Sequence, residues 1–398
     1  MFLREDYEGK IIQEIKFSGL QRTKESFIQS KVSRFIGKEY TEETPDEIIQ
    51  ALMLENLFEK VAVITDVISE ESVCVNVYVT EKITFVPLPF AGFSSGKFFG
   101  GLTVLDTNAF GVKDLFLLGG LYSSSARTGF SAYSRSPKDN HVPGFGVSFS
   151  AASNKKEILS TDNETYALKY NSQDFSAGLS LSEKINDMLS LKTGLSFVSV
   201  NAEDVSGYEG AADSVKMIDS SQTIGLGFSK WNGWFVSSCN TSLTANILFS
   251  NKEKYRTGKS VDLTVSLQKS FDCAPRLLFA SNSAFVYSCD THVSQWHGRS
   301  AVFSTILPDS FVTQEMCGTS DGIEFALAKS SFATYSIFAN YEAVRAKNFD
   351  GSYEICHGPS FGGRIYMSKI AFPALAVVYS YNVTKDYWQY SASLGIGR

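Results

Sequence analysis

The sequence predicts a mainly β protein, with a transmembrane antiparallel β-barrel of about 16 strands over residues 83–398 after one small α+β domain over residues 1–82. Three observations lead to this prediction. After residue 82, apolar and polar residues alternate in runs that often exceed about ten residues, close to what a tilted membrane-spanning strand needs. No stretch approaches about 18 uninterrupted apolar residues, which excludes a transmembrane helix. Net charge differs between the two parts of the chain. The first 82 residues carry 10 Lys and Arg against 16 Asp and Glu, whereas the other 316 carry 26 basic and 26 acidic residues.

The first domain is predicted to run strand, helix, helix, strand, strand. Thr23 is a good N-cap for the first helix, and Gly37 is a good stop for it. Thr44 is placed to cap the second helix, with a proline at its first helical position. The predicted elements are a strand over 10–19, a helix from Thr23 to Gly37, a helix from Thr44 to Leu57, and strands over 59–69 and 72–82.

Two short motifs in this domain have an informative spacing. The first strand ends with Phe17 and Gly19, and the last helix leads into Asn56, Leu57 and Phe58. Together they resemble a POTRA domain, with Asn56 where that family usually has a glycine, and Asn also accepts a left-handed backbone. The alternative is a generic small α+β domain. The resemblance implies that the domain binds extended, unfolded client proteins by adding a strand to its sheet edge.

The rest of the chain is predicted to be one long meander of strands. A soluble β-sandwich or β-propeller is the alternative. A propeller would show a repeat of about forty residues, and none is visible; the polar face of the strands is small and uncharged, which suits a barrel lumen. Short turns also alternate with longer polar loops. The predicted strands centre near residues 87, 103, 118, 131, 148, 174, 195, 224, 244, 264, 281, 325, 338, 360, 376 and 392.

The first turn of the meander contains Asp106, Asn108 and Gly111. Asn and Gly accept the left-handed conformations that a tight turn needs. A strand that ends in this pattern, directly after a POTRA-like domain, resembles the BamA/TamA superfamily of outer-membrane insertases and translocases. The resemblance implies a bacterial outer-membrane location with the first domain in the periplasm. The charged first ten residues predict no signal peptide in this chain. The implied partners are outer-membrane lipids, unfolded periplasmic clients and accessory assembly proteins.

The superfamily resemblance also implies a long sixth outer loop, here about 289–320, that folds into the lumen. In the family an arginine of this loop pairs with inward carboxylates of the wall. Arg299 is the candidate in this chain, and a solvated loop arginine is the alternative. Glu324 is the candidate wall carboxylate, because its apolar neighbours on the strand would face lipid. Asn340 replaces a second family carboxylate, and Glu342 on the same face is placed to substitute for it.

Cys289 and Cys317 flank this loop, and we hypothesise that they form a disulfide, with two free thiols as the alternative. None of the six cysteines lies in a C-x-x-C pair, and the histidines lack ligand spacing, so no metal or cofactor is expected. No nucleophile motif or phosphate loop is present, so we expect no enzyme. A basic patch for nucleic acid is also lacking.

The barrel is expected to close at a weak seam between its first and last strands. Glycine weakens strands, although the glycines of the first hairpin also suit simple turns. In the last strand, alternation directs large apolar residues to lipid and small ones to the lumen. The predicted seam residues are Gly92, Tyr390, Leu394, Gly395, Ile396 and Gly397.

The resemblance therefore predicts an outer-membrane protein insertion or translocation factor. Its first domain would capture a client, and the seam or lumen would pass it on. The alternatives are a dedicated secretion pore for one partner protein and a passive porin-like barrel.

Overall fold

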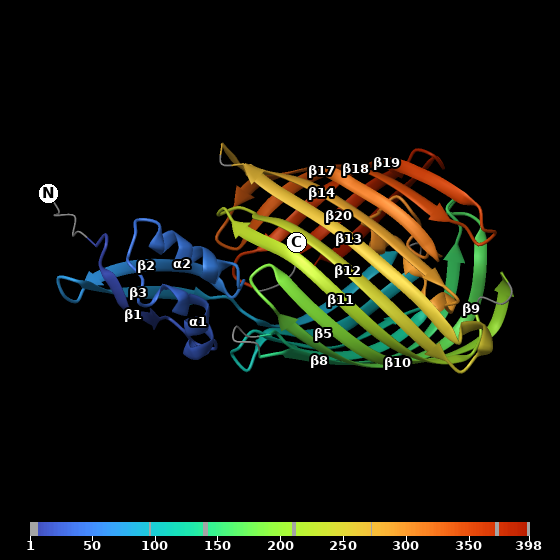
Figure 1. The fold of residues 1–398 in the computed structure, drawn as a ribbon. Coiled ribbons are helices and arrows are strands. Elements are labelled where there is room, and N and C mark those ends of the chain that lie inside the picture. The colour runs from blue at the N-terminus through green and yellow to red at the C-terminus, as the bar shows by residue number, and fades with distance from the viewer. Residues whose placement is uncertain are drawn as a thin grey trace.

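The computed structural model has a small N-terminal domain beside one end of a large β-barrel (Figure 1). The N-terminal domain ends with the strand that finishes at Glu81, and the barrel begins with the strand that starts at Phe85. No helix among the described residues is long and apolar enough to cross a membrane. The structure describes residues 7–94, 97–137, 142–208, 212–271, 273–370 and 374–395.

The N-terminal domain packs two helices on a three-stranded sheet of order β1-β3-β2, with β1 parallel and β2 antiparallel to β3. Its core consists of fully buried aliphatic side chains such as Ile28, Ile48 and Val75. Because β3 is central, the outer edge of β2 is the uncovered edge; β1 is partly covered by backbone bonds to residues 37–40. The elements are β1 (Ile11–Ser18), α1 (Glu25–Val32), η1 (Ser33–Phe35), α2 (Thr44–Met53), β2 (Phe58–Val67) and β3 (Ser72–Glu81).

The motif residues of this domain lie where the backbone conformation or the packing restricts the type of residue. Gly19 has φ +93°, and an added Cβ would lie 2.1 Å from the Val79 carbonyl oxygen, so only glycine fits. Asn56 has φ 60°, the left-handed conformation that its place in the motif predicts. Leu57 and Phe58 are buried in the core, and the partly buried Phe17 packs against it.

The helix starts differ from the predicted ones. α1 begins after Lys24, and no side chain caps it, because the Thr23 hydroxyl accepts a hydrogen bond from the barrel instead. In α2, Thr44 is the first helical residue rather than the cap, and Glu43 takes the cap position. The first helix also ends earlier than predicted. It was expected to stop at Gly37, but α1 ends at Val32 and a short 3₁₀ turn follows.

The barrel is a single 16-stranded sheet in which chain neighbours are paired antiparallel throughout, which confirms the predicted fold class. Every predicted centre falls inside a strand. The strands are β4 (Phe85–Ser94), β5 (Lys97–Ala109), β6 (Asp114–Ser123), β7 (Ala126–Arg135), β8 (Gly144–Leu159), β9 (Tyr166–Lys184), β10 (Leu189–Gly207), β11 (Val215–Trp231), β12 (Val236–Ser250), β13 (Thr257–Phe271), β14 (Ala274–Cys289), β17 (Glu315–Lys329), β18 (Ala333–Lys347), β19 (Tyr353–Met367), β20 (Ala374–Asn382) and β21 (Tyr387–Gly395).

The sixth long loop is shorter than predicted. It covers 290–314, because residues 315–320 already belong to β17. The loop contains η3 (Val293–Gln295), a small hairpin of β15 (His297–Gly298) and β16 (Val312–Thr313), and η4 (Arg299–Val302). A further 3₁₀ turn, η2 (Glu253–Tyr255), lies between β12 and β13.

The two faces of the sheet follow the alternation in the sequence. Outward residues are apolar and open, such as Leu179, Leu195 and Ile323 at 62%, 54% and 53% exposed. Inward residues are small and polar, and their hydroxyls bond across strands, as Thr223 does with Thr244 at 2.9 Å. The barrel therefore carries its apolar surface outside and its polar surface inside, the opposite of the N-terminal domain.

Candidate functional site

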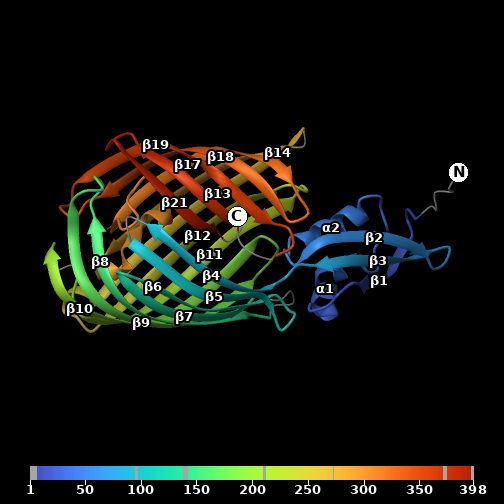
Figure 2. The same ribbon diagram turned by 180° about the vertical axis from the view of Figure 1, so that it is seen from behind.

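Residues 290–314, called the plug below, fold into the lumen at the barrel end remote from the N-terminal domain, as the orange segments inside the barrel show (Figures 1 and 2). Four apolar plug side chains are at most 1% exposed: Val302, Ile306, Leu307 and Phe311. They pack against inward residues of β14, β17 and β18, which include Val286, Met316 and Val344. The plug is therefore held by a small apolar core inside a lumen that is otherwise polar.

Glu342 of β18 attaches the plug to the wall. It is 1% exposed, and its carboxylate accepts hydrogen bonds from Thr305 N at 2.6 Å and Thr305 Oγ1 at 2.7 Å. Ser360 of β19 donates a third bond at 2.6 Å. The residue predicted to substitute for the lost family carboxylate thus contacts the plug, through neutral donors rather than an arginine.

Three side chains of β20 and β21 converge on one carbonyl oxygen of the plug. The Ile306 oxygen accepts from Tyr387 Oη at 2.9 Å, Gln389 Nε2 at 3.1 Å and Asn382 Nδ2 at 3.2 Å. Sequence reasoning missed this contact. The only available signal was that alternation directs Gln389 inward, and nothing in the sequence places it beside Ile306.

Arg299 does not pair with Glu324, so that expectation was wrong. Its guanidinium donates to the carbonyl oxygens of Thr305 at 3.1 Å and Leu307 at 2.6 Å, and it forms an ion pair with Asp309. It also donates to Gln389 Oε1 at 3.0 Å. Because Arg299 starts η4 and faces the following turn, it stabilises the plug's own fold and joins the plug to β21.

His292 anchors the other end of the plug. It is fully buried, and its Nε2 accepts a hydrogen bond from the backbone N–H of Asp213, in the loop before β11, at 3.1 Å. The Nδ1 atom accepts a hydrogen bond from Ser294 N at 3.1 Å, as the N-terminal cap of η3, and lies 2.9 Å from Ser294 Oγ. Burial lowers the pKa of His292 to about 4.

Glu324 of β17 is satisfied by the wall itself. It is 2% exposed and forms an ion pair with Arg364 of β19. Tyr366 Oη and Ser336 Oγ donate to it at 2.7 Å and 2.5 Å. The Arg364 guanidinium also stacks on Phe338, 4.1 Å from the ring centroid. Sequence reasoning missed Arg364, although the alternation of β19 would have placed it inward.

Asn340 takes part in neither carboxylate cluster. It is half-buried on β18 opposite Gly322 of β17. A Cβ on Gly322 would lie 2.2 Å from the Asn340 amide oxygen. The close approach at this pair requires the glycine.

The lumen half next to the N-terminal domain contains a cavity of about 1140 Å³. Barrel residues such as Gln268, Glu324 and Arg364 line it, and the N-terminal domain contributes Asn56 and Lys82. The Lys82 ammonium donates to Asn56 Oδ1 at 2.5 Å, and burial lowers its pKa to about 8. The cavity thus connects the N-terminal domain to the lumen below the plug.

The predicted turn motif forms the contact between the two domains. Asp106 forms an ion pair with Arg22 at 2.8 Å, and Asn108 Nδ2 donates to Thr23 Oγ1 at 2.9 Å. Lys24 N donates to the Gly111 carbonyl oxygen at 2.8 Å. Gly111 has φ +73°, and a Cβ there would lie 2.2 Å from the Arg22 carbonyl oxygen. The motif therefore makes a tight turn and also binds the segment before α1.

The first and last strands are the two ends of the sheet, and no pairing between β4 and β21 is found among the described residues. They have 10 and 9 residues, against 19 in β9 and β10. Ile83 N donates to the Lys369 carbonyl oxygen at 2.7 Å near this edge. Of the predicted seam residues, Gly92 lies in β4 and Tyr390, Leu394 and Gly395 lie in β21, whereas Ile396 and Gly397 lie outside the described residues.

The predicted disulfide does not form, because Cys289 and Cys317 are both free thiols. The strand register explains this, since Cys317 lies opposite Phe285, four residues along β14 from Cys289. Four residues span about 13 Å along a strand, whereas bridged cysteines need Cα atoms within about 7 Å.

Comparison with known proteins finds solved structures of similar fold. CdiB from Acinetobacter baumannii aligns over 97% of this chain and 73% of its own, with 13% identity and a TM-score of 0.58. CdiB from Escherichia coli aligns over 99% and 90%, with 12% identity and a TM-score of 0.50. BamA from Haemophilus ducreyi lacking POTRA domains 1–3 aligns over 96% and 84%, with 11% identity and a TM-score of 0.49.

No protein-family model matches the sequence, and no curated protein matches it. At identities this low the structural likeness concerns the fold. The chain therefore has the fold of the two CdiB structures, in agreement with the BamA/TamA-like architecture that its motifs predict.

Proposed function

We propose that this protein is a non-enzymatic outer-membrane factor that translocates or inserts unfolded polypeptides. The observation that carries the proposal is the divided lumen. An open cavity of about 1140 Å³ faces the N-terminal domain, and beyond it a folded segment fills the lumen. The side-chain bonds that hold the plug can be exchanged for water, and its apolar core contacts only inward side chains of the wall, so the plug can leave without unpairing the wall strands.

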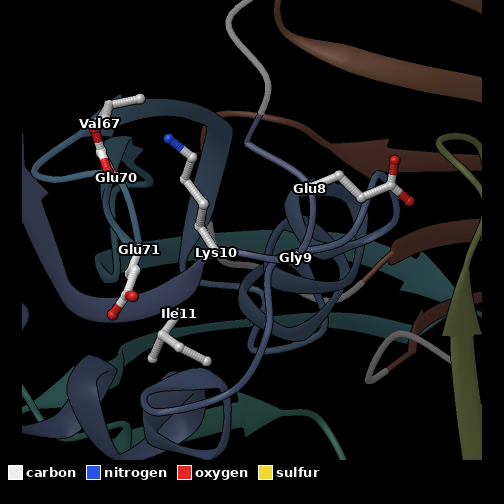
Figure 3. Close-up of a pocket in the computed structure, with 7 residues that line it drawn as sticks. All are labelled: Glu8, Gly9, Lys10, Ile11, Val67, Glu70 and Glu71. Atoms are coloured by element: carbon white, nitrogen blue, oxygen red, sulfur yellow. The ribbon is translucent and has the colours of Figure 1, made fainter.

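We assign client binding to the N-terminal domain, which would lie in the periplasm. The outer edge of β2 is open, and its side chains Ile64 and Val67 are exposed. An extended client can add to this edge through main-chain hydrogen bonds. At the end of β2, Val67 borders a cavity of about 780 Å³ with Glu8, Glu70 and Glu71 around it (Figure 3). Because these three carboxylates outnumber the one cation of the lining, Lys10, the cavity favours basic residues in the client.

Planar-bilayer conductance tests the translocation role. The intact chain should conduct weakly, and replacing residues 290–314 by a short Gly-Ser linker should open a large, steady pore. The control replaces residues 124–125, in the outer loop between β6 and β7, in the same way. Equal conductance of the intact and plug-deleted chains would contradict a plugged pathway.

Insertion at the seam is the second candidate. The features that favour it are the short end strands and the attachment of the plug to β20 and β21 through the Ile306 carbonyl oxygen. Release of the plug would also remove hydrogen bonds that hold these strands in place. Vesicles carrying the chain should then speed insertion of a urea-unfolded barrel protein. Equal insertion rates in empty vesicles would exclude this role.

A further inference from the structure

A polar patch interrupts the outward, apolar face of the barrel. On β14 and β17 the outward residues Ser281, Ser283, Thr319 and Asp321 lie in neighbouring register positions. Ser281 Oγ donates to Asp321 Oδ1 at 2.5 Å, and Thr319 Oγ1 donates to Asp321 Oδ2 at 2.9 Å. Ser283 Oγ donates to Thr319 Oγ1 at 3.3 Å. Two hydroxyls of the patch thus donate directly to the Asp321 carboxylate, and the third donates to one of those two.

The patch lies within the apolar band of the barrel. Along β14 the exposed side chains Phe279 and Phe285 lie on either side of it, and along β17 the exposed Ile323, Phe325 and Leu327 follow it. In a bilayer, Asp321 would therefore lie at the depth of the acyl chains. Ionisable groups at that depth are costly and usually have a partner. Among the described residues, Asp321 has no ion pair.

An apolar groove of about 450 Å³ begins beside the patch. Its lining includes the small residues Gly318 and Ala343, the larger apolar residues Leu263 and Ile355, and Arg345, while Ser283 and Thr319 belong to both the groove and the patch. Small residues between larger apolar side chains leave room for an apolar side chain of a binding partner. The groove and the patch together form one surface, in which an apolar depression adjoins the Asp321 carboxylate.

We propose that this surface binds the membrane-spanning segment of another protein, one that carries a lysine or arginine near its centre. Charge complementarity with Asp321 requires a cation, and acyl chains at that depth offer none. A second copy fits poorly, because two barrels in the same orientation bring Asp321 to the same depth. The nearest outward cation on β18, Arg345, lines the groove, but it lies four residues from the position opposite Asp321 and forms an ion pair with Glu315. The proposal depends on the barrel lying in a bilayer and not on client transport.

Association with model helices in lipid vesicles tests the proposal. The full chain carries a fluorophore on the exposed Cys273, with Cys239 and Cys289 replaced by serine and the groove residue Cys317 replaced by alanine. The probes are two apolar membrane-spanning peptides that differ only in a central Lys or Leu. Energy transfer should show at least tenfold tighter association of the Lys peptide, and Asp321→Asn should abolish that preference.

A control and a stability measurement separate binding from a structural role. Gln222→Leu removes another outward polar side chain, on β11, and should leave the preference intact. Asp321→Leu should keep or raise the urea midpoint of the barrel in vesicles. Equal binding of both peptides, a preference that survives Asp321→Asn, a lower midpoint for Asp321→Leu, or self-association that depends on Asp321 would each overturn the proposal.

Discussion

The two halves of the lumen are built from the same strands with the same alternation, yet one is filled and the other is open. The half remote from the N-terminal domain holds the plug and its apolar core. The half beside the N-terminal domain holds a cavity of about 1140 Å³. Glu342 in the filled half and Glu324 in the open half are both buried, inward carboxylates.

The difference lies in what each carboxylate binds. Glu324 is paired with a cation, Arg364, and both residues belong to the wall. Glu342 binds neutral donors, and two of its three bonds come from Thr305 of the plug. A satisfied ion pair within the wall stabilises the barrel itself, whereas bonds to a separate segment determine whether that segment stays. We therefore expect Glu324 to control stability and Glu342 to control opening.

Breaking the ion pair of the open half should have the largest effect. Glu324→Leu leaves the Arg364 guanidinium without a carboxylate, and removal of one partner of a buried pair costs about 3 to 5 kcal/mol. The adjoining cavity admits water, so we expect the lower end of that range. The measurement is the free energy of unfolding in urea, in lipid vesicles.

The double variant Glu324→Leu with Arg364→Leu is the control for this prediction. It should recover most of the lost stability, because no unpaired ion remains. A double variant as unstable as Glu324→Leu alone would contradict the role of the pair.

Removing the carboxylate of the filled half should open the pore instead. Glu342→Ala removes the acceptor of three hydrogen bonds and should favour plug release by about 2 to 3 kcal/mol. The open fraction in single-channel recordings should rise by roughly thirtyfold or more. Unfolding free energy should change little, and a large loss of stability with unchanged conductance would reverse the roles assigned to the two carboxylates.

Acidification should loosen the filled half at its His292 end. The pKa of His292 is lowered to about 4 in the folded plug, from an ordinary value of 6.5. Above pH 6.5 the ring is neutral whether or not the plug is folded, so its contact with Asp213 is fully stabilising. As pH falls below 6.5 the detached plug takes up a proton first, which favours release by about 2 kcal/mol at pH 5.

The charged neighbours of this histidine are Asp213, Lys254 and Asp174, and Tyr255 packs against the ring. Conductance recorded from pH 7 to pH 5 should rise in the wild type. In His292→Gln, which keeps an acceptor and does not titrate, it should stay flat. An equal rise in both proteins would assign the pH response to another group.

Of the changes considered, weakening the contact between the N-terminal domain and the open half of the barrel should have the smallest effect on the free energy of unfolding. Arg22→Ala removes a partly exposed ion pair with Asp106, worth at most about 1 kcal/mol. Spin labels at Glu70→Cys and Ser331→Cys should show a broader distance distribution with unchanged unfolding free energy. Gly111→Ala should shift the distance further, because its Cβ would overlap the Arg22 carbonyl oxygen. A narrow, unshifted distribution in both variants would show that the turn does not orient the domain.

Much of this architecture followed from the sequence. The number and centres of the strands and the facing of residues such as Ile323 and Glu324 follow from a period of two, which is local and repeats along the whole barrel. The special backbone of Gly19 and Asn56 also follows locally, because few residue types accept it.

Only the tertiary structure decided which side chains meet. Alternation places Glu324, Glu342 and Gln389 on the inner face, but their partners depend on strand stagger and on the path of the plug. Arg299 therefore joins its own loop and Gln389 rather than Glu324, and Cys289 stays apart from Cys317. The capping role predicted for Thr23 fails for the same reason, since its hydroxyl is used by Asn108 of the barrel. The face on which a side chain lies depends on its own strand alone, whereas the side chains that it contacts depend on several segments that are distant in the chain.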